Sequence, residues 1–287
     1  MAPRSGAAGP RAALAGARRL AGRLGGAFAA LALVGTIATT SAGSADAMST
    51  SFASHGPRTR PVVALTIDDG SNIANCRQIV EILELRRVNA TFFPIGRLAL
   101  ANTGFWRSVA AAGFPIGNHT ADHPDMTKLD YAHQLAQIDN GRRDIEAAIG
   151  RPTVRFFRPP EGAWNPVTLS AANAAGYPLV LNWDTSFADT SRNGVPADYI
   201  RNGLKGVNGS VILLHCGPAI TPKVLEAVID GYVSRGFGFV TLGQLFNVPG
   251  PVPYPTNAPP APSPSPTPSP SGEPWPLRYS RITTVAY

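Results

Sequence analysis

The feature that most constrains the fold is an alternation of short apolar runs with longer segments of helical character. Seven apolar runs lie at 62–67, 90–95, 114–118, 154–158, 178–183, 210–215 and 237–242. Helical segments lie between them at 74–88, 98–112, 127–149, 166–176, 197–205 and 221–235. Runs that are apolar throughout are typical of parallel strands covered on both faces. We therefore predict an α/β fold, a single-domain irregular (β/α) barrel of about seven parallel strands, with an open doubly wound sheet as the alternative.

The first 47 residues have the character of an export signal. Five arginines precede an apolar run at 27–38, and a stretch of small residues ends in Ala45-Asp46-Ala47. A positive region, a short apolar region and an A-x-A site predict a secretory signal peptide over 1–47. An uncleaved anchor is the alternative, although the run is short for a bilayer. We expect no membrane span in the mature chain.

The other end of the chain is rich in proline. Residues 248–276 include PSPSPTPSPS, which favours an extended linker, and 277–287 are too few to fold alone. We predict a Pro-rich linker over 248–276 and a disordered tail over 277–287. With a short leader at 48–57, the folded domain is expected to span 58–247.

The net charge of the chain excludes one class of partner. The chain has 25 basic and 18 acidic residues, a formal net charge of +7. Without the five arginines and one aspartate of the signal segment, 20 basic and 17 acidic residues remain, a net charge of about +3. No basic stripe with interleaved aromatics occurs, so we expect no nucleic-acid partner.

Ionisable residues recur where the predicted strands end. Asp68 and Asp69 follow the first run, His119 the third, Arg158 ends the fourth and His215 ends the sixth. In parallel α/β folds the site lies at the carboxyl ends of the strands. The sequence therefore predicts a single site on this rim. No phosphate-loop or dinucleotide fingerprint accompanies it, which disfavours a nucleotide cofactor.

The stretch GNHTADH, at 117–123, holds two of the five histidines. On a helix, His119 and His123 would share a face, but spacing alone leaves open a metal site or two unrelated histidines. The adjacent carboxylates of Asp68 and Asp69 both stay ionised only beside a positive charge. With Asp69 as a third ligand, two histidines and one aspartate make the open-sided set of a catalytic zinc site.

His215 ends an apolar run and has two interpretations. It is either a buried neutral histidine of the core or a general acid facing the metal. In the second case, Asp189 would orient it and keep it protonated. Arg158 would then pair with Asp68 and hold that carboxylate as a base.

Together these residues resemble the polysaccharide deacetylase family, the NodB-homology domain, over roughly 61–246. The matching motifs, in chain order, are TIDDGS (66–71), HTADH (119–123), RPPEG (158–162), WDTSFAD (183–189) and ILLHC (212–216). The resemblance implies a metal-dependent hydrolase that removes N-acetyl groups from an acetylated polysaccharide and releases acetate.

The resemblance also implies a role for each matched residue. Asp68 would be the base, and His215 would protonate the leaving amine. Arg158 would position Asp68, and Asp189 would support His215. The metal, expected to be Zn²⁺ with Co²⁺ or Ni²⁺ as alternatives, would be held by Asp69, His119 and His123. Substrate or oxyanion contacts are implied at Pro160, Glu161, Gly162, Trp183 and Leu214.

Two positions depart from the family pattern. Glu161 replaces the aromatic residue that is usual in the third motif, and Thr190 stands where a tryptophan is usual. A main-chain N–H is still supplied by Glu161, so catalysis can survive, but one wall of the pocket becomes acidic. The first departure puts substrate preference in doubt, and the second puts an apolar wall of the acetyl pocket in doubt.

Cys76 and Cys216 are the only two cysteines of the chain. Both are expected near the rim, and Cys216 directly follows His215. In an exported chain we predict that they form a disulfide, with two free buried thiols as the alternative.

The sequence thus predicts a monomeric N-deacetylase that is secreted or associated with the cell wall and acts on peptidoglycan N-acetylglucosamine or chitin oligomers. Two alternatives stay open at this point. One is an O-acetyl esterase acting on acetylated xylan, because the same chemistry cleaves esters. The other is a catalytically silent glycan-binding protein.

Overall fold

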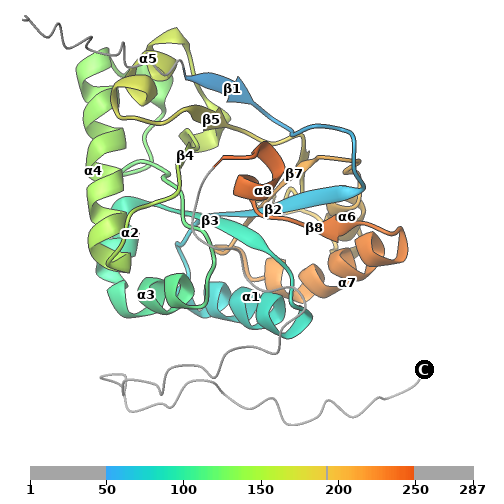
Figure 1. Cartoon of the computed structure of the whole chain (residues 1–287). Helices are drawn as coiled ribbons and strands as arrows, with labels where there is room; N and C mark the ends of the chain where they lie inside the picture. Colours follow the sequence, from blue (N-terminus) through green and yellow to red (C-terminus); the bar gives the residue numbers. More distant parts are fainter. Residues whose placement is uncertain (1–49, 192, 249–287) are drawn as a thin grey trace, which may run out of the picture. The chain divides into compact units, whose positions relative to one another are not determined.

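The computed structural model describes residues 50–191 and 193–248 (Figure 1). The predicted signal peptide at 1–47, the tail at 277–287 and all but the first residue of the predicted linker at 248–276 lie outside the described residues. Among the helices of the described part, none combines the length and the apolar character needed to cross a membrane.

Parallel strands form two sheets. The first has the order β3 (Ala90–Pro94), β2 (Val62–Asp69), β7 (Val211–His215) and β6 (Thr185–Ser186), with β8 (Gly238–Phe239) paired to the start of β2. The second has the order β1 (Ser51–Ala53), β5 (Leu179–Leu181) and β4 (Phe156–Phe157). Single parallel bridges, Phe92 to Ile116 and Asn118 to Phe157, connect the two sheets through the 114–118 segment. The predicted α/β class and parallel pairing are confirmed. Within the described residues, the ladders form two linked sheets without a continuous closed barrel.

Helices surround the strands, as Figure 1 shows for α4, α3, α1 and α7. The helices are α1 (Ile73–Arg86), α2 (Gly96–Ala101), α3 (Thr103–Ala111), α4 (Tyr131–Ile149), α5 (Pro166–Ala174), α6 (Pro196–Gly203), α7 (Thr221–Ser234) and α8 (Leu242–Phe246). Two short 3₁₀ turns are η1 (Met126–Lys128) and η2 (Pro160–Gly162).

Two predicted helices differ from those observed. The segment at 98–112 is divided into α2 and α3, because Asn102 leaves the helical region with φ −129° and ψ 40°. The segment at 127–149 begins its α-helix only at Tyr131. There the Asp130 side chain accepts a hydrogen bond from the His133 N–H and so caps the helix.

The central strand β2 explains why its run is apolar throughout. Val63, Leu65 and Ile67 join a core cluster with α1 and α7, whereas Ala64 joins a second cluster with Phe93 and residues of β5 and β7. Both faces of the strand are therefore buried. Because side chains alternate, Thr66 and Asp68 lie on the same face as Ala64, toward the interior between the strands.

The structure adds a strand where the sequence predicted only a short leader at 48–57. Ser51–Ala53 forms β1, which pairs in parallel with Leu179–Leu181 of β5. Beyond β1, His55 forms an antiparallel bridge with Ser210. The segment before residue 58 is therefore part of the packed structure.

Candidate active site

A buried ion pair joins the first and third motifs. Arg158 Nη1 donates to Asp68 Oδ1 at 2.7 Å, and both side chains are almost completely buried. The same Nη1 lies 2.9 Å from Thr66 Oγ1, and Arg158 Nε donates to the Leu181 carbonyl. Burial lowers the pKa of Arg158 below its ordinary value, and the charge and hydrogen bond of Asp68 offset part of this shift. The remaining oxygen, Asp68 Oδ2, lies 3.8 Å from His119 Nε2, so this carboxylate lies beside the metal ligands that the sequence predicts.

Asp69, His119 and His123 converge on one point. Asp69 Oδ1 lies 3.6 Å from Nε2 of His119 and 3.6 Å from Nε2 of His123. One ligand atom from each of the three residues lies within 4.8 Å of the others. Asp69 Oδ1 is buried and has no hydrogen-bond partner in the described structure. The three donors therefore form a cluster with spacing suited to a metal ion.

The protonation states of this cluster fit cation binding. Burial raises the pKa of Asp69, but the neighbouring His119 and the charges of His215 and His123 leave this pKa below its usual value. Burial and the neighbouring His119 lower the pKa of His123. An ionised carboxylate and a neutral imidazole are the forms that bind metal.

The two histidines lie on a loop, where the sequence analysis considered a shared helix face. Residues 119–123 contain no helical turn, and Thr120 and His123 have φ of 66° and 65°. The Asn118 side-chain oxygen accepts from the Thr120 N–H at 3.0 Å, which stabilises the turn. His119 Nδ1 donates to the Arg158 carbonyl at 2.8 Å, so its Nε2 is directed to Asp69.

Left-handed backbone is concentrated at the site. Seven non-glycine residues of the described chain have positive φ, and five lie on its loops: Asp69, Thr120, His123, Glu161 and Ala188. Such conformations cost roughly 1–3 kcal/mol each and persist where the surrounding structure imposes them. The backbone strain here falls on the residues that the motifs single out.

His215 and Asp189 form a complete hydrogen-bonded pair. His215 Nδ1 donates to Asp189 Oδ1 at 2.8 Å, and the His215 N–H donates to Oδ2 at 2.8 Å. Thr221 Oγ1 donates to the same Oδ2 at 2.6 Å. Burial alone lowers the pKa of His215, but the Asp189 hydrogen bond and the charges of Asp189, Asp68 and Asp69 raise it to about 9. His215 is therefore protonated at neutral pH in the metal-free protein, which suits a proton donor.

A disulfide joins Cys76 and Cys216, as predicted. Cys76 lies on α1, and Cys216 directly follows His215 at the end of β7. Both side chains are fully buried. The bridge links the strand that carries His215 to the helix that follows the Asp68-Asp69 turn. Asn75 Nδ2 adds a second link by donating to the Gly217 carbonyl at 2.8 Å.

The η2 turn places the third motif beside Trp183. Pro160 is buried, and Glu161, with φ 57°, is exposed. Gly162 has φ 68°, and a Cβ added there would lie 3.0 Å from the Trp183 ring. Only glycine fits both the backbone and the space at this position. Trp183 also covers the Arg158 guanidinium, 5.7 Å from its ring centroid.

One predicted substrate contact is placed differently. Leu214 lies in the hydrophobic core with α1 and α7, with no exposed surface, so it does not face the site. Side chains alternate along a strand, so a residue adjacent to His215 points to the opposite face. Leu213 shares the face of His215 and is the β7 residue placed to line the site.

Three supporting residues were not found from the sequence. Thr66 accepts from Arg158, Thr221 donates to Asp189, and Asn118 supports the histidine loop. Strand alternation puts Thr66 on the face of Asp68, so a period-two count would have found it. The sequence contains no comparable signal for Thr221, which reaches the site from the start of α7.

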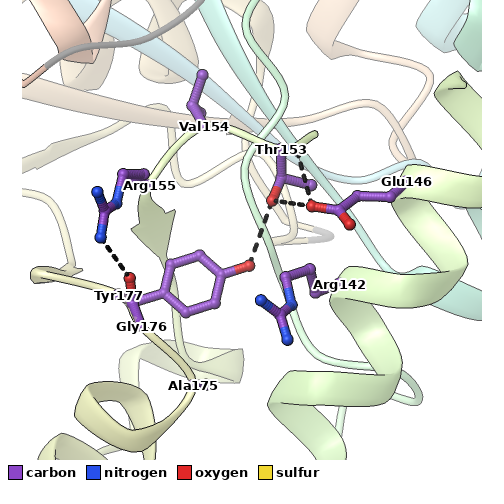
Figure 2. Close-up of a pocket in the computed structure, with 8 residues that line it drawn as sticks. All are labelled: Arg142, Glu146, Thr153, Val154, Arg155, Ala175, Gly176 and Tyr177. Carbon is purple, nitrogen blue, oxygen red and sulfur yellow. Dashed lines mark hydrogen bonds between the residues drawn. The ribbon is translucent and has the colours of Figure 1, made fainter. Parts of the chain in front are cut away.

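A hollow about 340 Å³ in volume lies away from this site, between α4, the turn that follows α5 and the segment before β4. Figure 2 shows Tyr177 beside Thr153, with Arg142 and Glu146 on α4. The Tyr177 hydroxyl accepts from Asn118 Nδ2 at 3.0 Å, and burial raises its pKa to about 12. Its lining includes no residue of the predicted site, and Tyr177 contributes to the site only through Asn118, which stabilises the histidine loop.

Comparison with known proteins agrees with the motifs. A family model described as polysaccharide deacetylase matches residues 55–180. A chitooligosaccharide deacetylase of Sinorhizobium fredii is 35% identical over 159 residues, covering 55% of this chain and 73% of the relative. A solved peptidoglycan N-acetylglucosamine deacetylase aligns with a TM-score of 0.66 and 28% identity, covering 70% of this chain and 94% of that chain.

A further solved structure carries a different description. It is a CE4 family pseudoenzyme from Bacillus anthracis, with a TM-score of 0.65 and 26% identity, and the match covers 69% of each chain. Taken with the ordered motifs and the site geometry, these matches show that the chain belongs to the polysaccharide deacetylase family and is a hydrolase of carbon–nitrogen bonds other than peptide bonds.

Proposed function

We propose that this protein removes N-acetyl groups from peptidoglycan N-acetylglucosamine or from chitin oligomers, with a divalent cation at Asp69, His119 and His123. The observation that carries the proposal is the convergence of three groups. The metal-ligand cluster is flanked by a carboxylate held by Arg158 and by His215 held by Asp189. A base, an acid and an electrophile on one rim are the components that amide hydrolysis requires.

The three ligands fit a divalent cation. Asp69 Oδ1 is buried without a partner, so a cation would satisfy an otherwise costly carboxylate oxygen. The set of two imidazoles and one carboxylate favours Zn²⁺, with Co²⁺ or Ni²⁺ as alternatives. A cation bound there supplies Lewis acidity, which polarises a carbonyl group and makes water more acidic.

The chain's own residues account for the proton transfers. Asp68, oriented through Oδ1 by Arg158, takes a proton from the attacking water. His215, oriented through Nδ1 by Asp189, gives a proton to the departing nitrogen from Nε2. The Glu161 N–H stands at the start of η2, where helical turns leave N–H groups without internal partners. In this proposal that N–H stabilises the developing oxyanion, together with the neighbouring loop.

We also propose that the protein acts as a monomer outside the cell, free or at the cell wall. The signal-peptide pattern at 1–47 and the buried disulfide support export, because disulfides persist in oxidising compartments. The proline-rich segment at 248–276 would then act as a spacer after the domain.

The decisive experiment measures acetate release from peptidoglycan, chitooligosaccharides and acetylxylan, with Zn²⁺ or Co²⁺ supplied. We expect release from at least one N-acetylated substrate. Asp68→Asn is expected to lower kcat by about 10²–10⁴-fold while glycan binding persists. Asp230→Asn, the same change on the outer helix α7, serves as the matched control.

Each other outcome identifies one of the alternatives. Release from acetylxylan alone would identify an O-acetyl esterase. Glycan binding without acetate release from any substrate would identify a silent glycan-binding protein; one solved relative is described as a pseudoenzyme.

A further inference from the structure

Glu161 differs from the other carboxylates of the site. Its side chain is exposed, and no hydrogen bond or ion pair engages it within the described chain. By contrast, Asp68 is paired with Arg158, and Asp189 accepts three hydrogen bonds. The negative charge of Glu161 is therefore available to a ligand at the rim.

The loop fixes where this charge lies. The Glu161 backbone is left-handed, with φ 57°, and Asn182 Nδ2 donates to the Gly162 carbonyl at 2.9 Å. Arg158, three residues earlier, contacts Asp68 at 2.7 Å. Gly162, the next residue, lies against the Trp183 ring, and Trp183 covers the Arg158 guanidinium. The turn that carries Glu161 therefore borders the Asp68–Arg158 pair, and the exposed carboxylate extends from this turn.

An aromatic side chain lies three residues further along the same loop. Trp164 stacks on Phe52 of β1, with ring centroids 4.4 Å apart and an angle of 23° between planes. Trp164 is partly exposed and belongs to none of the buried core clusters. The face of an indole attracts an ammonium group. The segment 161–164 thus carries an anionic side chain and an indole, both of which favour a positively charged ligand.

We propose that Glu161 and Trp164 form a subsite for a sugar that carries a free amine, beside the acetylated sugar that reacts. This inference rests on the proposed function, because each turnover would leave an amine that is protonated at neutral pH on the glycan. An anionic and an aromatic group together bind that cation better than a neutral N-acetyl group. The enzyme would therefore prefer glycan that is already partly deacetylated.

The test compares two chitotetraoses of equal length, one fully N-acetylated and one with a glucosamine unit beside an N-acetylglucosamine unit. The quantity measured is kcat/KM for acetate release per acetyl group, at low and high salt. We expect the wild-type protein to favour the glucosamine-containing oligomer. Glu161→Gln should lower that preference ratio by about two- to fivefold, and Trp164→Leu by a similar factor.

Salt gives a second readout, because it screens the attraction between the Glu161 carboxylate and the ammonium group of the sugar. A loss of the preference through misfolding would not depend on salt in this way. The wild-type preference should fall as salt rises, whereas the Glu161→Gln ratio should stay constant. Glu226→Gln, which removes the same charge from the exposed surface of α7, should keep the wild-type ratio and its salt dependence.

Two results would overturn the subsite. One is an equal ratio in wild type and Glu161→Gln, and the other is a wild-type preference for the fully acetylated oligomer. Failure of the wild-type protein to release acetate from either oligomer or from peptidoglycan would instead refute the proposed function, and the subsite with it.

Discussion

The metal-ligand cluster, Asp69 with His119 and His123, and the pair His215 and Asp189 belong to one site but are built in opposite ways. In the cluster, a buried carboxylate oxygen has no partner, and two of the three residues have left-handed backbone. In the pair, the Asp189 carboxylate accepts three hydrogen bonds from His215 and Thr221. One half of the site is thus incomplete without a ligand, and the other is complete.

This difference separates two tasks. A residue that must bind a cation cannot also satisfy its own ligand atoms internally. A residue that must donate a proton gains from a fixed partner that holds the proton until it is used. Added Zn²⁺ should therefore change the free energy of unfolding through the metal-ligand cluster. A change of pH should change it through the pair of His215 and Asp189. The Cys76–Cys216 disulfide, which links the two halves, should stabilise both.

The largest expected effect comes from cutting that link. Cys76→Ser with Cys216→Ser removes a bridge that closes a loop across a sequence separation of 140. Loop-closure entropy predicts a loss of about 4–5 kcal/mol in the free energy of unfolding. Urea unfolding of the metal-free variant and wild type would measure it. A loss below 1 kcal/mol would show that the packing of α1 against α7 suffices to hold the two halves together.

Zinc should stabilise the wild-type protein through the cluster alone. At a free Zn²⁺ concentration 1,000 times the Kd, the gain is about 4 kcal/mol. Asp69→Ala should abolish this gain, while costing the metal-free protein little because the lost oxygen had no partner. Calorimetric unfolding with and without Zn²⁺ tests both statements, with Asp189→Asn as a variant that should keep most of the gain.

The pair should make the metal-free protein sensitive to alkaline pH. The pKa of His215 is raised to about 9 in the folded protein, from about 6.5 when unfolded. The stability it contributes, about 3 kcal/mol, is fully present below pH ~6.5 and is lost as pH rises through about 9. NMR titration of the His215 ring would show this pKa, and Asp189→Asn should lower it by at least about one unit. An unchanged titration in Asp189→Asn would contradict the assigned cause.

The smallest expected effect comes from removing the hydrogen bond that Thr221 donates to Asp189. Thr221→Val removes one hydrogen bond to Asp189 and should cost about 1.5–3 kcal/mol of stability. The pKa of His215 should change only slightly, because the Asp189 charge remains. A fall in this pKa as large as that in Asp189→Asn would mean that Thr221 holds Asp189 in place.

How much of the fold and of the site could be predicted depended on how strong a pattern each segment carries in its own sequence. The β2 run with Asp68 and Asp69 at its end was visible because both faces of the strand are buried. The histidine spacing indicated proximity, but the left-handed residues Thr120 and His123 that produce it leave no trace in the composition of the loop.

The misplacement of Leu214 has a different origin. It was assigned from its neighbour in a motif, whereas strand alternation directs it into the core. Strand β1 was missed because three residues carry no periodic pattern, and their partner β5 lies more than a hundred residues away. Contacts of such sequence separation are set by tertiary packing and not by local preference.

Strand β1 also determines where a shortened form of the protein can begin. The family match begins at residue 55, and a recombinant chain cut there would lack Ser51–Ala53. Strand β5, with the apolar sequence Leu179–Leu181, would then be left as an unpaired edge. Exposed apolar edges recruit strands from other molecules. A chain begun at residue 50 should therefore stay dispersed at concentrations at which one begun at residue 55 aggregates.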